Sequence, residues 1–196
     1  QTTDSGYILT GFTNADDIAL IKTDAAGNTL WAKAYGGTAS DVGRQVQQTT
    51  DGGFIITGYH YLIKTDSIGD TLWTKTFVGS IIGFSIKQTL DGGYIITGYT
   101  NSFGAGSDDV YVIKTDANGD TLWTKTYGGN NRNYAVFVQQ CNDGGYIITG
   151  THQPFGGANS DIYLLKTDSN GILQWTKTFG EAAGDDIEVS VRQTTD

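Results

Sequence analysis

Few residues in this sequence could carry acid–base or nucleophilic chemistry. The only histidines, His60 and His152, are far apart in the chain and share no sequence context. No serine stands in a nucleophile-elbow pattern, and no His/Cys spacing fits a zinc site. Two carboxylates facing each other across a ring of sheets would have the chemistry of a glycosidase pair, but spacing along the chain does not show such a placement. We therefore expect a protein that is not an enzyme.

Aspartates gather in turns, which makes calcium the metal to consider. The turn that begins at Asp116 lacks the twelve-residue loop and the terminal glutamate of a helical calcium site. A hairpin turn whose aspartate bonds its own backbone explains it instead. Adjacent aspartates remain as candidates for calcium between sheets, namely Asp16-Asp17, Asp108-Asp109 and Asp185-Asp186. We predict no cofactor and no metal, with calcium at these pairs as the alternative.

An internal repeat organises the chain. The segment Gln88 to Tyr99, QTLDGGYIITGY, recurs around a marker aspartate, and the markers lie 40 to 53 residues apart at Asp4, Asp51, Asp91, Asp143 and Asp196. This period is that of a four-stranded propeller blade. We expect one repeat domain over 1–196, with repeats at about 1–46, 47–86, 87–138 and 139–191, and with 186–193 as a first strand that could complete the first blade.

The third copy is the most regular and serves as the template. Asp-Gly-Gly and Asp-Ala-Asn-Gly turns separate runs rich in β-branched and aromatic residues, a pattern typical of antiparallel strands. The four expected strands are Ile82–Thr89, Tyr94–Thr100, Asp109–Thr115 and Asp120–Tyr127. Both faces of the fourth run mix apolar and polar residues, which favours sheets stacked on both sides. The sequence predicts an all-β propeller, either a closed ring of four blades or part of a larger one.

Each copy has a tryptophan in its fourth strand, at Trp31, Trp73, Trp123 and Trp175. An exposed tryptophan would suit a sugar ring, but recurrence at one position of every copy favours packing between blades. Each tryptophan follows an aspartate and a turn glycine, and the aspartates are Asp24, Asp66, Asp116 and Asp168. We expect these tryptophans and aspartates to dock each blade against the next.

The segment Asp109 to Trp123 resembles the propeller repeats of the quinoprotein type, in which an aspartate, a turn glycine and a tryptophan dock neighbouring blades. The whole unit is also similar to repeats of large secreted and cell-surface bacterial proteins. This resemblance covers nearly the entire chain. It implies a propeller fold and an adhesion or binding role outside the cell.

Composition narrows the classes of partner that the chain is expected to bind. The net charge of −9 opposes binding to nucleic acid and to anionic membrane surfaces. The single cysteine, Cys141, replaces the threonine of other copies and cannot form an intrachain disulfide. No run is apolar enough for a membrane span. Because the sequence begins at Gln1 and contains no methionine, we expect it to be a piece of a longer precursor.

The connections between the second and third strands differ most among the copies. Copies three and four have long ones, with Phe103 and Phe155 beside glycines, and with Asp108 and His152 at their ends. Copy two has almost none, since Tyr59, His60 and Tyr61 follow directly on each other. Because loops carry function on rigid scaffolds, we predict that Phe103, Asp108, His152 and Phe155 contact a ligand. The alternative is that each phenylalanine folds back on its own loop.

These observations predict an extracellular or cell-surface module that binds or displays a protein or a glycan and does no catalysis. A structural spacer or filament-forming repeat is the alternative, in which the chain associates with itself. An enzyme is the least favoured.

Overall fold

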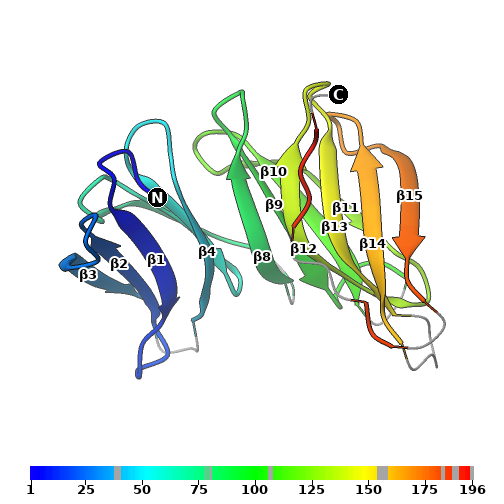
Figure 1. The fold of residues 1–196 in the computed structure, drawn as a ribbon, viewed down its shortest axis with the longest axis horizontal. Helices are drawn as coiled ribbons and strands as arrows, with labels where there is room; N and C mark the ends of the chain where they lie inside the picture. The colour runs from blue at the N-terminus through cyan, green and yellow to red at the C-terminus, as the bar shows by residue number, and fades with distance from the viewer. Residues whose placement is uncertain are drawn as a thin grey trace. The chain divides into compact units, whose positions relative to one another are not determined.

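The computed structural model describes residues 1–37, 41–77, 79, 81–105, 108–153, 159–181, 184–186 and 190–194. These residues form fifteen strands in four antiparallel sheets and no helix (Figure 1). The first sheet has three strands, β1 (Tyr7–Phe12), β2 (Ile18–Thr23) and β3 (Thr29–Tyr35). The second sheet consists of β4 (Gly43–Gln48), β5 (Phe54–Gly58), β6 (Tyr61–Thr65) and β7 (Thr71–Thr76).

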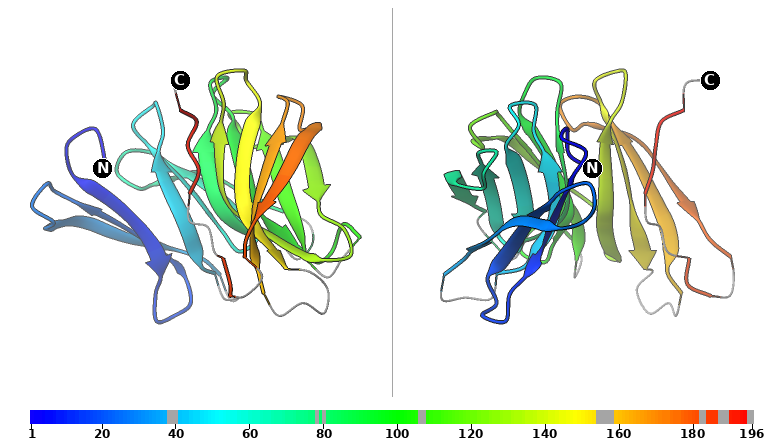
Figure 2. Two further views of the ribbon diagram at one scale, coloured as in Figure 1. Left: turned by 45° about the vertical axis from the view of Figure 1, so that its right-hand side comes forward. Right: turned by 60° about the vertical axis from the view of Figure 1, so that its left-hand side comes forward.

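The third sheet consists of β8 (Ile81–Gln88), β9 (Tyr94–Thr100), β10 (Asp109–Thr115) and β11 (Thr121–Tyr127). The fourth consists of β12 (Arg132–Gln140), β13 (Tyr146–Gln153), β14 (Asp161–Thr167) and β15 (Leu173–Phe179). Strands that are consecutive in the chain lie side by side within each sheet (Figure 2). The prediction of an all-β fold of antiparallel blades is confirmed, and in the third copy the predicted bounds of β9 and β10 are those observed.

The chain divides into two compact units, which we describe separately. Unit 1 is Gln1–Phe77 and holds the first and second sheets, and unit 2 is Val78–Asp196 and holds the third and fourth. The second, third and fourth sheets each begin before their marker aspartate, because their first strands β4, β8 and β12 precede it. The first sheet lacks such a strand in the described part of unit 1.

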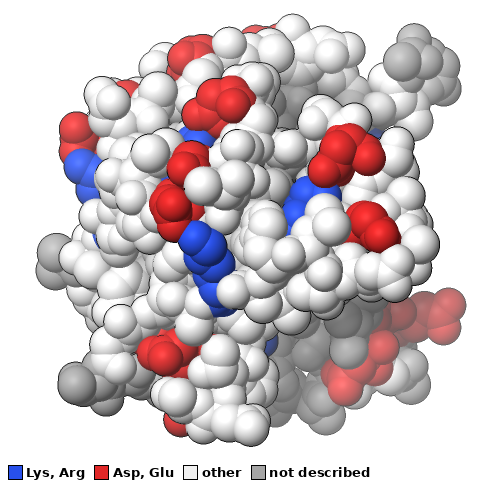
Figure 3. All heavy atoms as spheres, turned by 90° about the vertical axis from the view of Figure 1, so that its left-hand side faces the viewer, with Lys and Arg blue, Asp and Glu red and all other residues white. Residues whose placement is uncertain are grey.

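A lysine holds the marker turn to its sheet in every copy, and it is buried in the first three copies and nearly buried in the fourth. In the third copy, Lys114 is 3% exposed, and its Nζ donates to the Thr115 carbonyl at 2.8 Å and pairs with the Asp91 carboxylate at 2.9 Å. Asp91 also accepts hydrogen bonds from the Thr89 hydroxyl and the Gly93 amide. The equivalent pairs are Lys22–Asp4, Lys64–Asp51 and Lys166–Asp143. On the face shown in Figure 3, basic side chains lie next to acidic ones, as these pairs require.

These lysine–aspartate pairs predict that the protein loses stability in acid. Burial raises the pKa of Asp91, but hydrogen bonds from Thr89 and Lys114 outweigh that effect, so the pKa is lower in the folded protein than in the unfolded chain. Such a carboxylate contributes stability above its unfolded pKa of 3.8, and this stability is lost as the pH falls through the folded pKa. We expect the melting temperature to fall as the pH is lowered below about 4, and Asp91→Asn to make the decline shallower.

The control is Glu181→Gln, which removes an exposed carboxylate of unit 2 for which no such pair is found among the residues that the structure describes. Thermal melts of the three proteins over an acidic pH series test the prediction. If the melting temperatures of the wild type and of Asp91→Asn fell equally steeply with pH, the Lys114–Asp91 pair would not contribute to stability.

The last strand of a sheet packs the face that carries its tryptophan onto the following sheet, as β3 of the first sheet and β11 of the third sheet show. In unit 1, Trp31 meets Phe54 of β5 edge to face, with ring centroids 5.9 Å apart, and the Tyr35 hydroxyl donates to the Gly69 carbonyl at 2.6 Å. A Cβ added at Gly69 would lie 3.0 Å from the Trp31 ring, so the glycine keeps the indole close to the turn. Lys33 pairs with Asp70 in the same interface.

Unit 2 repeats this interface. Trp123 meets Tyr146 of β13 at 6.0 Å, and the Tyr127 hydroxyl donates to the Gly171 carbonyl at 2.6 Å. Burial raises the pKa of Tyr127 well above its usual value, so this hydroxyl stays a donor. The apolar cluster around the interface includes Val110, Val112, Val138 and Leu165.

The four motif aspartates act within their own turns. Asp116 Oδ1 accepts the amides of Asn118 and Asp120 at 2.9 and 2.8 Å, and Asp24, Asp66 and Asp168 accept the corresponding amides. All the hydrogen bonds found for these carboxylates stay inside the turn. The contact with the neighbouring sheet comes from the tryptophan, the tyrosine and the glycine carbonyl, and the aspartate shapes the turn that carries that carbonyl.

A glutamine of each following copy reaches back to the preceding marker turn. The amides of Thr3, Leu90 and Asn142 donate to the side-chain oxygens of Gln48, Gln140 and Gln193 at 2.8 to 2.9 Å. Gln193 therefore occupies the position of a first-strand glutamine. The described residues of the expected strand at 186–193 nevertheless form no strand.

Candidate functional site

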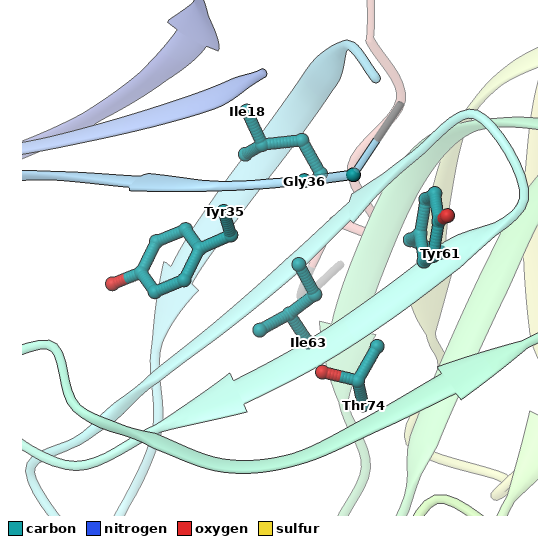
Figure 4. Close-up of a pocket in the computed structure, with 7 residues that line it drawn as sticks. Ile18, Tyr35, Gly36, Tyr61, Ile63 and Thr74 are labelled. Carbon is teal, nitrogen blue, oxygen red and sulfur yellow. The ribbon is translucent and has the colours of Figure 1, made fainter. Parts of the chain in front are cut away.

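Each sheet has two ends. The marker turns lie at one end, and the connections between second and third strands lie at the other. The links from one sheet to the next also lie at this other end. We call this the loop end. In unit 1 the loop end holds a cavity of about 150 Å³ between the first and second sheets (Figure 4). Its lining consists of Ile18, Tyr35, Gly36, Gly37, Tyr61, Ile63 and Thr74.

The short connection of copy two explains why this cavity is open. β5 ends at Gly58 and β6 begins at Tyr61, so only Tyr59 and His60 join them. His60 takes a positive φ of 59°, a conformation that histidine adopts more readily than β-branched residues, and its carbonyl accepts the Phe77 amide at 2.9 Å. A tight turn of this kind has no residues left over to fold across the Tyr61 side of the cavity.

Gly36 and Gly37 form one wall of the cavity, and carboxylates lie next to Gly36. A Cβ added at Gly36 would overlap the Asp17 carboxylate and lie 2.8 Å from Asp41 Oδ2, so only glycine fits there. Asp41 is buried and accepts the Gly37 amide at 3.0 Å. Negative charge therefore lies directly behind the glycine wall.

Two tyrosines give the cavity its aromatic character, and both are half-buried. Burial, helped by the carboxylates of Asp70 and Asp66, raises the pKa of Tyr35 to about 12. The Tyr35 hydroxyl thus stays protonated and donates to Gly69, which leaves the ring to face the cavity. The volume is below the range of about 300 to 1,000 Å³ typical of whole small-molecule pockets, so the cavity suits a single ring or side chain of a larger ligand.

The loop end of unit 2 carries a hydrogen-bonded cluster of charged and aromatic side chains. Asp108 Oδ2 pairs with the Arg132 guanidinium at 2.9 Å and accepts the Tyr134 hydroxyl at 3.2 Å. The guanidinium also lies over the Tyr134 ring, 5.5 Å from its centroid. Asp108 is nearly buried, whereas the Arg132 side chain is half exposed, so the pair presents a fixed cation to solvent.

His152 joins the same cluster through Asn133. The Asn133 amide donates to the Asp108 carbonyl at 2.8 Å, and its side-chain oxygen lies 2.7 Å from His152 Nδ1. The other ring nitrogen of His152 lies 3.3 Å from the side-chain nitrogen of Asn131. This arrangement suits a neutral imidazole that donates from Nδ1 and accepts at Nε2. Both nitrogens of the ring are therefore engaged.

Phe103 lies away from this cluster. Its ring stacks on Tyr111, with centroids 5.8 Å apart, and touches the backbone position of Gly79. Alternation along β10 puts Tyr111 on the face opposite Val110 and Val112, which pack toward β12. The structure thus brings Asp108 and His152 together and keeps Phe103 apart, folded back over its own sheet. Phe155 lies outside the described residues.

Sequence reasoning missed the cavity. Its apolar lining reads as ordinary core in the sequence, and its residues come from β2, β3, β6 and β7 of two different copies. One signal in the sequence could have indicated it, namely the very short connection at His60. A sheet whose second and third strands are joined by a tight turn has no loop to cover the space beside the neighbouring sheet.

Two of the aspartate pairs considered as alternative calcium sites have a member that lies beside a glycine. Asp17 and Asp41 both lie close to the Cβ position of Gly36, and Asp109 lies close to that of Gly128. Among the residues that the structure describes, no group of three His, Cys, Asp or Glu side chains is placed to hold a metal ion. The same part of the chain contains no helix that is long and apolar enough to cross a membrane.

Comparison with solved structures places the fold among propellers. A protein of unknown function from Bacteroides caccae aligns with 92% of this chain at a TM-score of 0.63 and 12% identity. The WD40 domain of Neurospora crassa Pan2 aligns with 89% of it at a TM-score of 0.59 and 11% identity. The chain spans 60% and 51% of the lengths of these two proteins. No family model matches the sequence, and no curated protein is significantly similar to it. At these identities the likeness shows the propeller fold alone.

Proposed function

We propose that this chain is a non-catalytic binding module of an extracellular or cell-surface protein, and that it takes a carbohydrate ligand at its loop end. The observation that carries the proposal is the aromatic cavity between the first and second sheets. It is a preformed hollow on a rigid pair of sheets, at the end where the connections differ most between copies. Sites of this type are where propellers and other scaffolds place recognition.

The chemistry of the cavity favours a neutral sugar ring. Tyr35 and Tyr61 offer aromatic faces against which the apolar face of a pyranose packs. Gly36 and Gly37 let the ligand approach the backbone closely, and Asp17 lies behind them as an acceptor for hydroxyl groups. An anionic group would be repelled by the same carboxylates and by the net charge of −9.

The arrangement of His152 supports a role without catalysis. A general base needs a ring nitrogen free to take a proton from the substrate, and both nitrogens of His152 are engaged by asparagines. The Asp108 carboxylate likewise pairs with Arg132 and accepts a hydrogen bond from Tyr134. We propose that this cluster contacts a ligand through the exposed Arg132. The proposal includes no cofactor, no nucleic acid and no insertion into a membrane.

Filling the cavity tests the proposal. Thr74 lines the cavity from an exposed position on β7, so Thr74→Trp puts an indole into the space while leaving the core intact. On a printed array of neutral oligosaccharides we expect wild-type protein to bind a defined subset. For the best of these, titration calorimetry should give at least about tenfold weaker binding by Thr74→Trp, as is usual when a contact near the centre of a site is lost.

The matched control is Leu72→Trp. Leu72 lies on the same strand and the same face as Thr74 but does not line the cavity. This variant adds the same side chain to the surface and should bind like the wild type. An array with no wild-type signal, or equal binding by Thr74→Trp and the wild type, would contradict a carbohydrate site in this cavity. Capture of a protein ligand that Thr74→Trp abolishes would redirect the proposal to a protein partner.

A further inference from the structure

The Arg132 guanidinium of unit 2 is held in one position by its neighbours. Its Nε donates to Asp108 Oδ2 at 3.0 Å, and its Nη2 lies 2.9 Å from the same oxygen. It also lies over the Tyr134 ring, whose hydroxyl donates to Asp108 Oδ2. The hydrogen bond to Asp108 raises the pKa of Arg132, so the group stays a cation. Because this cation is already fixed, a ligand that binds it loses little side-chain freedom.

Asp108 uses only one edge of the guanidinium. Nε and Nη2 form the side edge, which faces Asp108. Nη1 and the second N–H of Nη2 form the end edge, which faces away from Asp108 by the planar geometry of the group. The Arg132 side chain is 51% exposed, whereas that of Asp108 is 10% exposed. The end edge is therefore a fork of two N–H donors on a half-exposed side chain, and such a fork matches the two oxygens of a carboxylate.

A row of aromatic rings lies beside this fork. Tyr134 of β12 meets Tyr99 of β9 edge to face, with ring centroids 4.9 Å apart, and Tyr99 meets Phe84 of β8 at 5.7 Å. All three rings are partly exposed. Arg132 lies over the last ring of the row, that of Tyr134. The third and fourth sheets of unit 2 thus place a cation at one end of an aromatic surface, and the apolar face of a sugar ring packs on surfaces of this kind.

The charges of the cluster favour a ligand with a single carboxylate. Asp108 already offsets the charge of Arg132, and the chain has a net charge of −9. A phosphate group with two negative charges would meet repulsion that one paired guanidinium does not offset. A carboxylate carries one charge and gains two charge-assisted hydrogen bonds at contact. Salt screens the more distant charges beyond about 8 Å, so they oppose this contact less.

We propose that the Arg132 fork and the aromatic row bind an acidic sugar, whose carboxylate pairs with Arg132 and whose ring packs on the row. The ligand class is a hexuronic acid residue of a polysaccharide. This proposal rests on the proposed function, because it takes the ligand of the chain to be a carbohydrate. The site lies within unit 2 and shares no residue with the cavity of unit 1, so either site can fail without the other.

Titration with trigalacturonate, followed by chemical shifts in nuclear magnetic resonance spectra, tests the site. The matched ligand is its fully methylated ester, which keeps the rings and loses the charges. We expect trigalacturonate to bind the wild type at least about tenfold more tightly than the ester, because hydrogen bonds to charged groups are the stronger ones. Arg132→Gln should weaken trigalacturonate binding about tenfold or more. Arg132→Lys keeps a cation beside Asp108 but lacks the fork, so it should also bind less tightly than the wild type.

Arg44→Gln is the matched control variant. Arg44 is an exposed arginine of β4 in unit 1, and its guanidinium lies over the Tyr59 ring, 5.0 Å from the centroid. The variant removes the same charge from the chain as Arg132→Gln does and should bind trigalacturonate like the wild type. Circular dichroism checks that each variant is folded. If Arg132→Gln does not fold, Arg132→Lys and the ester decide the question.

Four results would overturn the proposal. Trigalacturonate that binds no more tightly than the ester would exclude recognition of the carboxylate, and equal binding by the wild type and both Arg132 variants would exclude the fork. An equal loss in Arg44→Gln and Arg132→Gln would show attraction by net charge alone. A peptide of three glutamates that binds as tightly as trigalacturonate would replace the sugar by an acidic peptide.

The two proposed sites can be told apart by their ligands. If the wild type binds trigalacturonate through Arg132 but binds no neutral oligosaccharide through the cavity, only the cavity proposal has failed. The reverse result removes only the acidic-sugar site of unit 2.

Discussion

Gly98→Ala is expected to destabilise unit 2 by about 3 kcal/mol or more, at the upper end of the cost of overpacking. Gly98 lies in β9 opposite Gly83 of β8, at the bulge where β8 shifts its register. An added methyl group would overlap the Ile82 carbonyl, which is backbone and cannot swing aside as a flexible side chain would. The strands would have to separate, with loss of ladder hydrogen bonds on both sides of the bulge.

The matched variant is Gly11→Ala, the same change at the equivalent residue of the first sheet. A Cβ at Gly11 meets nothing within 4 Å, so we expect stability to change by less than about 0.5 kcal/mol, or to rise slightly through the smaller entropy of the unfolded chain. Urea denaturation of both variants measures the difference. Equal midpoints for the two variants would mean that β8 does not crowd β9 as the structure indicates.

Trp123→Ala is expected to destabilise unit 2 by about 3 kcal/mol, the lower end for loss of a core aromatic, because the indole is only partly buried. The change removes the edge-to-face contact with Tyr146 and leaves a gap beside Gly171, against which the indole packs. The Tyr127 hydrogen bond to Gly171 borders the same gap and should become solvated. The loss therefore affects the interface between the third and fourth sheets as a whole.

Leu122→Ala provides the control for Trp123→Ala, because Leu122 is the preceding residue of β11 and is mostly exposed. We expect it to change stability by less than about 0.5 kcal/mol. Denaturation followed by tryptophan fluorescence and by circular dichroism compares the two variants. A Trp123→Ala protein that unfolds at the wild-type midpoint would show that the tryptophan does not hold the two sheets together.

The strands of the third copy could be predicted because strand formation here is local. Turn residues fix where each run starts, and the alternation of β-branched residues fixes its length, so β9 and β10 have the predicted bounds. The first strand begins one residue earlier than expected, at Ile81, and β11 begins one residue later, at Thr121. Both differences lie where a strand end depends on the neighbouring strand, which spacing along one chain does not report.

The candidate site was less predictable because its parts meet only in three dimensions. The loop rule pointed to Asp108 and His152, but not to their shared partner Asn133 or to the exposed Arg132, which both come from β12 of the fourth sheet. Phe103 was chosen as an aromatic residue beside glycines in a long loop. In the structure its ring stacks on Tyr111 and is still 44% exposed, and whether it contacts a ligand stays a prediction. Nothing in the sequence marks Ile18 or Ile63 as lining a cavity, since each looks like an ordinary strand residue.

The sequence by itself determined the repeat and the four-stranded unit, because periodicity and turn chemistry are properties of the chain alone. Only the tertiary structure decided which repeated residues are covered and which are not. Tyr7 and Tyr146 have the same sequence context, and so have Trp123 and Trp175, yet one of each pair is packed and the other is exposed. Burial depends on what lies across the interface, and a repeated motif contains no record of whether its neighbour is present.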